Sequence, residues 1–217
     1  MKTNLRLKAD RAKQLRCKNL IAVLENPKTI ENIGSVVRNI DALGVQKLYV
    51  VDGYRLLPAY WQTMRETGSL NKISVSAIKW AFVKCYPDTD SCIKYLNSKG
   101  FVSMVTSPHL KGKKNVILEE GDYTHKKLAI WFGNESQGVS QAAIDNSECC
   151  INIPMCGIIE SLNLGTSTGI VLYEATKQRR KYLKRKAKEL LLGDMIDKQI
   201  MKTIKGQQRP GGLLHQL

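Results

Sequence analysis

The sequence predicts an α/β fold in which helices flank a mostly parallel β-sheet. Short apolar runs alternate along the chain with longer segments whose apolar residues recur every three or four positions. Such alternation is typical of buried parallel strands connected by amphipathic helices. Asn, Pro and Gly stand between many of these segments, where turns are expected. The 217 residues allow one full domain with appendages.

Each expected element follows from its own pattern. The apolar runs that we expect to be strands are 19–25, 47–52, 72–75, 101–106, 127–133 and 149–155. The segments that we expect to be helices are 1–18, 31–43, 58–66, 88–99, a short one from about 140, and a long one that begins between 163 and 167. Gly44 and Gly100 stand where the second and fourth of these helices should end. The tail 205–212 is expected to lack fixed structure.

The positive charge of the chain is confined to its two ends. The net charge is +15, from 34 Lys and Arg against 19 Asp and Glu. Residues 19–176 hold fifteen charges of each sign, whereas residues 1–18 carry +6 and residues 177–217 carry +9. A run of basic residues can also be an ordinary helix face in contact with water. Two basic segments beside a neutral body, however, favour a polyanionic partner, above all nucleic acid. We therefore divide the chain into a basic helix (1–18), a central domain (19–180) and a basic helical extension with a tail (181–217).

We expect neither a metal site nor a membrane segment. The six cysteines and three histidines lack the short ligand spacings of a zinc site, and Cys149 and Cys150, in an apolar run, should be reduced and buried. No apolar run approaches the roughly 20 residues that cross a bilayer, and residues 1–18 are too charged for a signal peptide. These observations predict a cytoplasmic protein.

Polar loops follow three of the expected strands, after Glu25, Phe132 and Met155. Because a parallel sheet binds ligands at the carboxyl ends of its strands, these loops form the candidate site. The fingerprint G-x-G-x-x-G is missing after the first strand, and the chain has no G-x-x-x-x-G-K-[ST]. An ordinary Rossmann dehydrogenase and a P-loop NTPase are therefore both disfavoured.

The third loop lies within "IPMCGIIESLNLGTSTGIVLYEA" (153–175) and is rich in small residues. Between Met155 and Ile170 it has three glycines and five Ser, Thr or Asn side chains. The backbone N–H groups of such a loop can bind a ligand at a helix N-terminus. An ordinary strand-to-helix turn with a good N-cap would have a similar composition, so this loop alone does not decide between the two.

Three segments together resemble the motifs of the SPOUT methyltransferase superfamily, in its SpoU branch. They are "NIGSVVRNIDALGV" (32–45), "WFGNESQGVS" (131–140) and 153–175, and they occur in the family's order at compatible spacing. The similarity extends over about residues 19–180. The resemblance implies an RNA 2′-O-ribose methyltransferase with S-adenosylmethionine as its cofactor. It also implies a deep C-terminal trefoil knot and a homodimer whose active site forms across the two subunits.

The resemblance assigns cofactor binding to backbone groups of the knotted loops. The positions that match this role are Thr106, Gly133, Ile153, Met155, Gly157 and Leu162. Since a knotted loop passes close to its neighbours, we expect replacement of Gly157 by Val to cause a steric conflict.

The resemblance also makes Arg38 the central catalytic residue. The residues implied to act around it are Asn32, Glu135, Ser161 and Asn163. The family's arginine has been proposed as a general base, but a guanidinium holds its proton tightly, which favours a forked contact with an RNA phosphate. Glu135 should fix Arg38 or its loop. Ser161 and Asn163 stand where they can also cap the last helix.

A compact chain with a basic helix at each end resembles the tRNA-modifying members of the SpoU branch, which methylate guanosine 18. The implied partner is therefore tRNA. The implied RNA contacts are Arg6, Arg11, Lys177 and Arg179. The long first motif "NPKTIEN" and a short tail after Lys188 depart from the family pattern and leave the exact nucleotide open.

Three other functions stay open at this point. The chain could methylate rRNA or another tRNA position, it could bind RNA without catalysis, or it could be an α/β enzyme acting on a small nucleotide. The missing phosphate fingerprints and the basic ends disfavour the last of these. Saturable binding of S-adenosylmethionine separates the enzyme from the non-catalytic RNA-binding protein.

Overall fold

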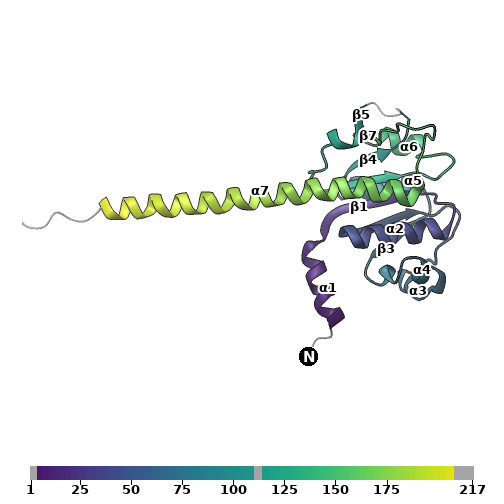
Figure 1. Ribbon diagram of the computed structural model, residues 1–217, viewed down its shortest axis with the longest axis horizontal. Coiled ribbons are helices and arrows are strands. Elements are labelled where there is room, and N and C mark those ends of the chain that lie inside the picture. Colours follow the sequence, from purple (N-terminus) through teal and green to yellow (C-terminus); the bar gives the residue numbers. More distant parts are fainter. Residues whose placement is uncertain (1–3, 110–113, 208–217) are drawn as a thin grey trace, which may run out of the picture. The chain divides into compact units, whose positions relative to one another are not determined.

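The computed structural model describes residues 4–109 and 114–207 (Figure 1). Within these residues one seven-stranded sheet has the order β3-β2-β1-β6-β4-β7-β5, and each of its six pairings is parallel. The strands are β1 (Cys17–Glu25), β2 (Val45–Val51), β3 (Phe82–Tyr86), β4 (Val102–Thr106), β5 (Asn115–Ile117), β6 (Leu128–Phe132) and β7 (Cys149–Asn152). The predicted α/β fold with a mostly parallel sheet is therefore confirmed.

Helices cover both faces of this sheet. They are α1 (Asn4–Leu15), α2 (Ile30–Leu43), α3 (Trp61–Glu66), α4 (Gly68–Ile73), α5 (Thr89–Ser98), α6 (Gln141–Asp145) and α7 (Leu164–Gln207), with 3₁₀ turns η1 (Ala77–Lys79) and η2 (Leu118–Glu120). Val36 of α2 and Val171 of α7 belong to the core on one face. Leu96 of α5 and Ala143 of α6 belong to the core on the other face. Burial on both faces explains why the central strands are continuously apolar.

Side-chain caps fix the starts of three helices near the candidate site. The Thr29 hydroxyl accepts a hydrogen bond from the Asn32 amide at the start of α2, at 3.3 Å. Asp88 and Ser140 cap α5 and α6 in the same way. At the other end of α2, Gly44 has a φ of 76°, which confirms it as the C-cap.

One prediction about the elements is wrong, and two strands were not predicted. Residues 72–75 do not form a strand, because α4 continues to Ile73, whose side chain packs where Gly34 of α2 leaves room. Val75, which follows, has a φ of 51° that no strand allows. The sequence pattern also failed to predict β3 and β5, the two edge strands, in which exposed residues interrupt the apolar run.

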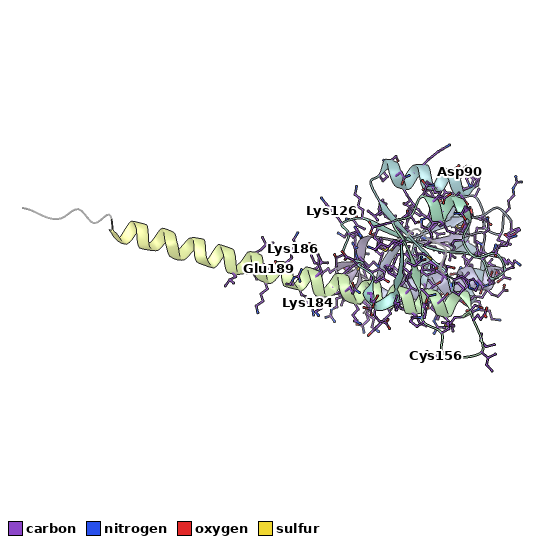
Figure 2. The ribbon with its side chains drawn as sticks, turned by 90° about the horizontal axis from the view of Figure 1, so that it is seen from above. Asp90, Lys126, Cys156, Lys184, Lys186 and Glu189 are labelled. Carbon is purple, nitrogen blue, oxygen red and sulfur yellow. The ribbon has the colours of Figure 1, made fainter. Side chains whose placement is uncertain are left out.

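The chain divides into two compact units, residues 1–179 and 180–217. The second unit is described only as the helical residues 180–207. Of its side chains up to 192, all except Tyr182 are exposed, including Lys184, Lys186 and Glu189 (Figure 2). Of the predicted unstructured tail 205–212, residues 205–207 belong to α7 and the rest lie outside the described residues.

The remaining structural expectations concern membranes, metals and thiols. Within the described residues, no helix is long and apolar enough to cross a membrane, and no three His, Cys, Asp or Glu side chains are grouped to hold a metal ion. All six cysteines are free thiols. Cys149 and Cys150 are buried, as predicted, and burial raises the pKa of Cys149 to about 11. Cys156 is exposed, on a loop at the edge of the molecule (Figure 2).

Candidate active site

A cavity of about 450 Å³ lies at the carboxyl ends of β4, β6 and β7. Its volume is in the range of sites that hold a small molecule. Five of the six residues predicted to bind the cofactor line it: Thr106, Gly133, Ile153, Met155 and Leu162. Loops that are far apart in sequence therefore meet at one cavity, as expected for a parallel sheet.

The loop after β6 is a preformed turn. Backbone amide and carbonyl groups of Asn134 and Gly138 bond to each other in both directions, at 3.2 and 3.0 Å. The Asn134 side chain accepts hydrogen bonds from the Ser136 and Gln137 amides, at 3.0 and 2.7 Å. A Cβ atom on Gly133 would lie 1.9 Å from the carbonyl carbon of Gly138, so only glycine fits there. The turn thus brings backbone close to the cavity.

The prediction of a steric conflict at Gly157 is wrong in this structure. Gly157 is exposed, and a Cβ atom there would meet only the Ile159 amide nitrogen, at 4.0 Å. It is also absent from the described residues that line the cavity. The close-packed glycine of the site is Gly133. The assignment of Gly157 to the cofactor stays a prediction.

A second, open cavity, of about 360 Å³, is lined by the central residue of the first motif. Arg38, Asn39, Thr166 and Asn163 are among its lining residues. Asn163 also lines the first cavity, so the two cavities adjoin at this residue. Arg38 is exposed, and α2 carries it at a solvent-accessible position. The structure therefore places Arg38 and the predicted cofactor loops in adjoining spaces.

Asn163 also caps α7. Its Oδ1 accepts hydrogen bonds from the Gly165 and Thr166 amides, at 2.8 and 3.3 Å. Both amides would otherwise lack an intrahelical partner. Helix capping therefore explains this asparagine locally, and its position between the cavities makes it a candidate for a second role. Ser161 is exposed and lines the first cavity only.

Asn32 and Glu135 join the first and second motifs. The Asn32 side-chain amide donates a hydrogen bond to the Glu135 carboxylate across 103 positions of sequence. The contact connects the start of α2 with the loop after β6. Glu135 thus contacts the helix that carries Arg38, and Glu135 also lines the first cavity.

The charge of the first cavity differs from that of the whole chain. Glu135 and Glu160 line it, and among the described residues its lining includes no Lys or Arg. The chain as a whole has 34 such basic residues. A carboxylate-lined cavity stabilises a cationic ligand and disfavours a phosphate. S-adenosylmethionine carries a positive sulfonium and an ammonium group, so these residues fit it.

The two predicted RNA contacts on α1 have no hydrogen bond or ion pair with other described residues. Arg6 and Arg11 are exposed on this helix, as are Lys8 and Lys13. Arg16, which follows the helix, is used within the fold instead. Its guanidinium donates to the Asp41 carboxylate and to the carbonyl oxygen of Trp80, both at 2.6 Å.

The two predicted RNA contacts on α7 already have intramolecular partners. Lys177 donates to Glu174 at 2.6 Å, and this bond raises the pKa of the amine and lowers that of the carboxyl group. Arg179 donates to the carbonyl oxygens of Tyr123 and His125, at 2.8 and 2.6 Å, and burial lowers its pKa. Arg179 thus holds a loop to α7, and a role for it toward RNA stays a prediction.

Two residues of the site were missed by sequence reasoning. Asn134 shapes the turn after β6, and Asn39 lines the second cavity beside Arg38. Asn134 could have been found, since Asn followed by small polar residues and Gly is typical of such turns. Asn39 carries no such signal, because its importance depends on the helix that packs against it.

Comparison with known proteins identifies the family. A model of the SpoU rRNA methylase family matches residues 19–173. The chain belongs to this family. Among curated relatives of this SpoU methylase, the tRNA (guanosine(18)-2′-O)-methyltransferase of Thermus thermophilus is 30% identical over 163 residues, 75% of this chain and 77% of that protein. The enzyme of the same name from Aquifex aeolicus is 33% identical over 165 residues, 76% of this chain and 72% of that protein.

Solved structures agree with this assignment. A crystal structure of the A. aeolicus TrmH/SpoU tRNA modifying enzyme superposes with a TM-score of 0.67 at 30% identity, covering 83% of the SpoU methylase described here and 86% of that chain. The SpoU methyltransferase AviRb from Streptomyces viridochromogenes, in complex with AdoMet, gives a TM-score of 0.64 at 24% identity, over 79% and 64% of the two chains. This second similarity supports the fold alone.

Proposed function

We propose that this SpoU methylase transfers a methyl group from S-adenosylmethionine to the ribose 2′-hydroxyl of guanosine 18 in tRNA. The observation that carries the proposal is the position of Asn163, which lines both cavities. One cavity is carboxylate-lined and suits a cationic cofactor; the other is lined by Arg38 and suits a phosphate. Two such cavities meeting at one residue match a transfer reaction between the ligands that they hold.

The side chains have distinct roles in this proposal. Gly133, Ile153, Met155 and Leu162, with Thr106 beside them, hold the cofactor, which when bound supplies a methyl group attached to positively charged sulfur. Arg38 stays protonated and binds the phosphate beside the target ribose.

Other residues keep these groups in place. Asn32 and Glu135 hold the start of α2 against the loop after β6. Asn163 lies where the two cavities meet, and Ser161 lines the cofactor side only. Fixing both ligands in one geometry supplies much of the rate of a transfer reaction.

The relatives' names support the choice of substrate. The relatives from T. thermophilus and A. aeolicus, at 30% and 33% identity, are both tRNA (guanosine(18)-2′-O)-methyltransferases. The test is methylation of unmodified tRNA by the purified chain, with 2′-O-methyl positions mapped afterwards. We expect modification at guanosine 18 and none in a transcript with adenosine there. Modification elsewhere in tRNA, or only in rRNA, would refute this substrate.

We also propose that the chain forms a deep trefoil knot at its C-terminal end. Support comes from the order of the strands, because β4 lies between β6 and β7 in the sheet. After β7 the chain passes from the face of α6 to the face of α2 before it forms α7. A crystal structure that traces residues 100–180 without a break would test this topology.

A homodimer and a cytoplasmic location complete the proposal. Exposed apolar side chains favour a partner subunit, since Ile158 is 98% exposed and Tyr173 is 57% exposed. Sedimentation equilibrium tests the dimer, and microscopy of the tagged chain tests the location. We assign methyl transfer to residues 19–180 and RNA binding to the basic segments 1–18 and 181–217.

A further inference from the structure

A turn at the carboxyl end of β2 presents two adjacent side chains to solvent. Tyr54 is 54% exposed, and Arg55 beside it is also exposed. Neither side chain has a hydrogen bond, ion pair or ring contact with the described residues. Because β2 is parallel to β1, this turn lies at the same edge of the sheet as the two cavities.

The turn is rigid, because hydrogen bonds among its own residues hold its backbone. The Arg55 amide donates to the carbonyl oxygen of Asp52 at 3.1 Å. The Asp52 carboxylate accepts from the Leu56 and Leu57 amides, at 2.9 and 2.8 Å, and Leu57 is buried. The turn therefore presents Tyr54 and Arg55 from a fixed base.

Arg55 adopts a backbone conformation that favours glycine. Its φ is 55°, in the left-handed region where a Cβ atom is strained. Residues other than glycine that keep such a conformation cluster at functional sites. A turn that only connected β2 to α3 would be relaxed by glycine at this position. Arg55 thus combines a strained backbone conformation with an exposed guanidinium.

The turn contacts the loop that leads to the first motif. The Gly53 amide donates to Oδ1 of Asn26, at 3.1 Å, in the loop between β1 and α2. In the sheet β2 is two strands away from β6, and strands lie about 4.8 Å apart, so β2 itself lies about 10 Å from the strand before Gly133. An RNA strand that lies along this edge of the sheet is long enough to span the distance between the two strands.

We propose that Tyr54 and Arg55 bind the RNA strand beside the target nucleotide, with Tyr54 stacked on an unpaired base and Arg55 on a phosphate. Aromatic rings stack on unpaired bases of any sequence, and a guanidinium forms paired hydrogen bonds to phosphate. The local charge agrees, since residues 53–79 hold four Lys or Arg and one acidic residue. This inference rests on the proposed function, because it requires RNA in the second cavity.

The first experiment detects stacking directly. Full-length tRNA carries 2-aminopurine at a position next to guanosine 18, and its fluorescence is followed as the complete protein is added. Stacking on Tyr54 quenches the signal with the wild type and with Tyr54→Phe, which keeps the ring. The Tyr54→Ala protein should leave the fluorescence near that of free tRNA. It should also bind tRNA about tenfold more weakly, the usual effect of losing one stacked base.

The second experiment tests the phosphate contact. Arg55→Gly relaxes the turn and removes one cation, so the protein should keep its melting temperature and lose affinity for tRNA. The slope of log affinity against log salt should fall by about 0.7, the value for one phosphate contact to a single strand. Lys94→Ala, which removes an exposed charge from α5, is the matched control and should keep the wild-type slope.

The outcomes separate this inference from the proposed function. If the wild type binds no S-adenosylmethionine and methylates no tRNA, the proposed function fails. If the wild type methylates tRNA while Tyr54→Ala and Arg55→Gly bind it normally, the inference is wrong and the proposed function stands. An equal loss in Tyr54→Phe and Tyr54→Ala would exclude stacking. Binding of S-adenosylmethionine should be the same in all of these variants, which shows that each is folded.

Discussion

Asn39 donates a hydrogen bond of 2.6 Å from its side-chain amide to the carbonyl oxygen of Gly165. This bond connects α2, which carries Arg38, to the first turn of α7, which Asn163 caps. The two helices approach closely here, since a Cβ atom on Gly165 would lie 3.1 Å from that of Ser35. The position of Arg38 relative to Asn163 therefore depends on this crossing.

Replacement of Asn39 by Ala should impair turnover more than ligand binding. The variant loses a partly buried hydrogen bond, which lowers stability by about 1 kcal/mol. A small shift of α2 moves Arg38 away from its working position, and such misplacement reduces turnover by about 10- to 100-fold. The measurement is single-turnover methylation of tRNA together with calorimetric titration of S-adenosylmethionine, whose affinity should stay within about twofold.

Asn97→Ala is the control for this prediction, because Asn97 is an exposed asparagine on α5. It should keep wild-type turnover. A loss of melting temperature in Asn39→Ala without any loss of turnover would mean that the bond to Gly165 serves stability alone.

Gly133→Ala should abolish cofactor binding, because its Cβ atom would lie 1.9 Å from the carbonyl carbon of Gly138. The turn must open to admit the alanine side chain, and overpacking of this kind costs about 3 kcal/mol of stability. Gly157→Ala is the matched control and should bind S-adenosylmethionine normally, since its Cβ atom meets only one atom, at 4.0 Å. Calorimetry on both proteins checks the prediction. Absence of binding in Gly157→Ala would show that residues 153–162 close on the cofactor.

The central strands could be predicted from sequence because both of their faces are buried. β1 and β6 each present an unbroken apolar run, and the structure keeps both nearly as expected. The edge strands could not be predicted in this way. β3 contains the exposed Phe82 and the half-buried Lys84, and β5 is three residues long. An edge strand can be recognised only from its pairing with a neighbouring strand, and that neighbour is distant in sequence.

The candidate site shows the same division. Motif residues indicated that Gly133, Ile153 and Asn163 would lie near one another, and they line one cavity. The sequence could not reveal that Asn163 lines a second cavity with Arg38, because this depends on how α2 crosses α7. Nor could it reveal the partners of Arg179, whose two carbonyl acceptors are more than fifty positions away.

Glu160→Gln should weaken the binding of S-adenosylmethionine more than the binding of its demethylated product. Glu160 lines the first cavity and has no partner among the described residues, whereas Glu135 is held by Asn32. The product lacks the positive sulfonium, so loss of a nearby carboxylate affects it less. At the accessible rim of a cavity one charge pair contributes about 1 kcal/mol, which corresponds to about fivefold in affinity.

Titration of both compounds into the Glu160→Gln protein makes the comparison, with Asp90→Asn on α5 as the control (Figure 2). An equal loss for both compounds would assign Glu160 to the shared ammonium group. No loss for either would remove Glu160 from the cofactor site.

Deletion of residues 1–15 should weaken tRNA binding and reduce its dependence on salt. Arg6 and Arg11 are exposed on α1, so the deletion removes the cations that would bind phosphates there. The slope of log affinity against log salt should fall by about 0.7 to 0.9 for each phosphate that is no longer neutralised. The deletion ends before Arg16, which holds Asp41 and must be kept for stability. Filter binding over a range of salt tests this, and a slope equal to that of the intact chain would exclude α1 from the RNA interface.

Arg38 provides the strictest test of the mechanism, because it is exposed and lines the cavity that adjoins the cofactor loops. If it orients the ribose through a forked contact with phosphate, Lys cannot replace it, since Lys lacks the planar pair of donors. Arg38→Lys and Arg38→Ala should then both lose about a hundredfold or more in turnover. Both should still bind S-adenosylmethionine, whose predicted contacts are in other loops. Single-turnover methylation alongside calorimetry makes the comparison. Near-normal turnover in Arg38→Lys would mean that the residue acts only as a positive charge. Near-normal turnover in Arg38→Ala would remove it from the active site.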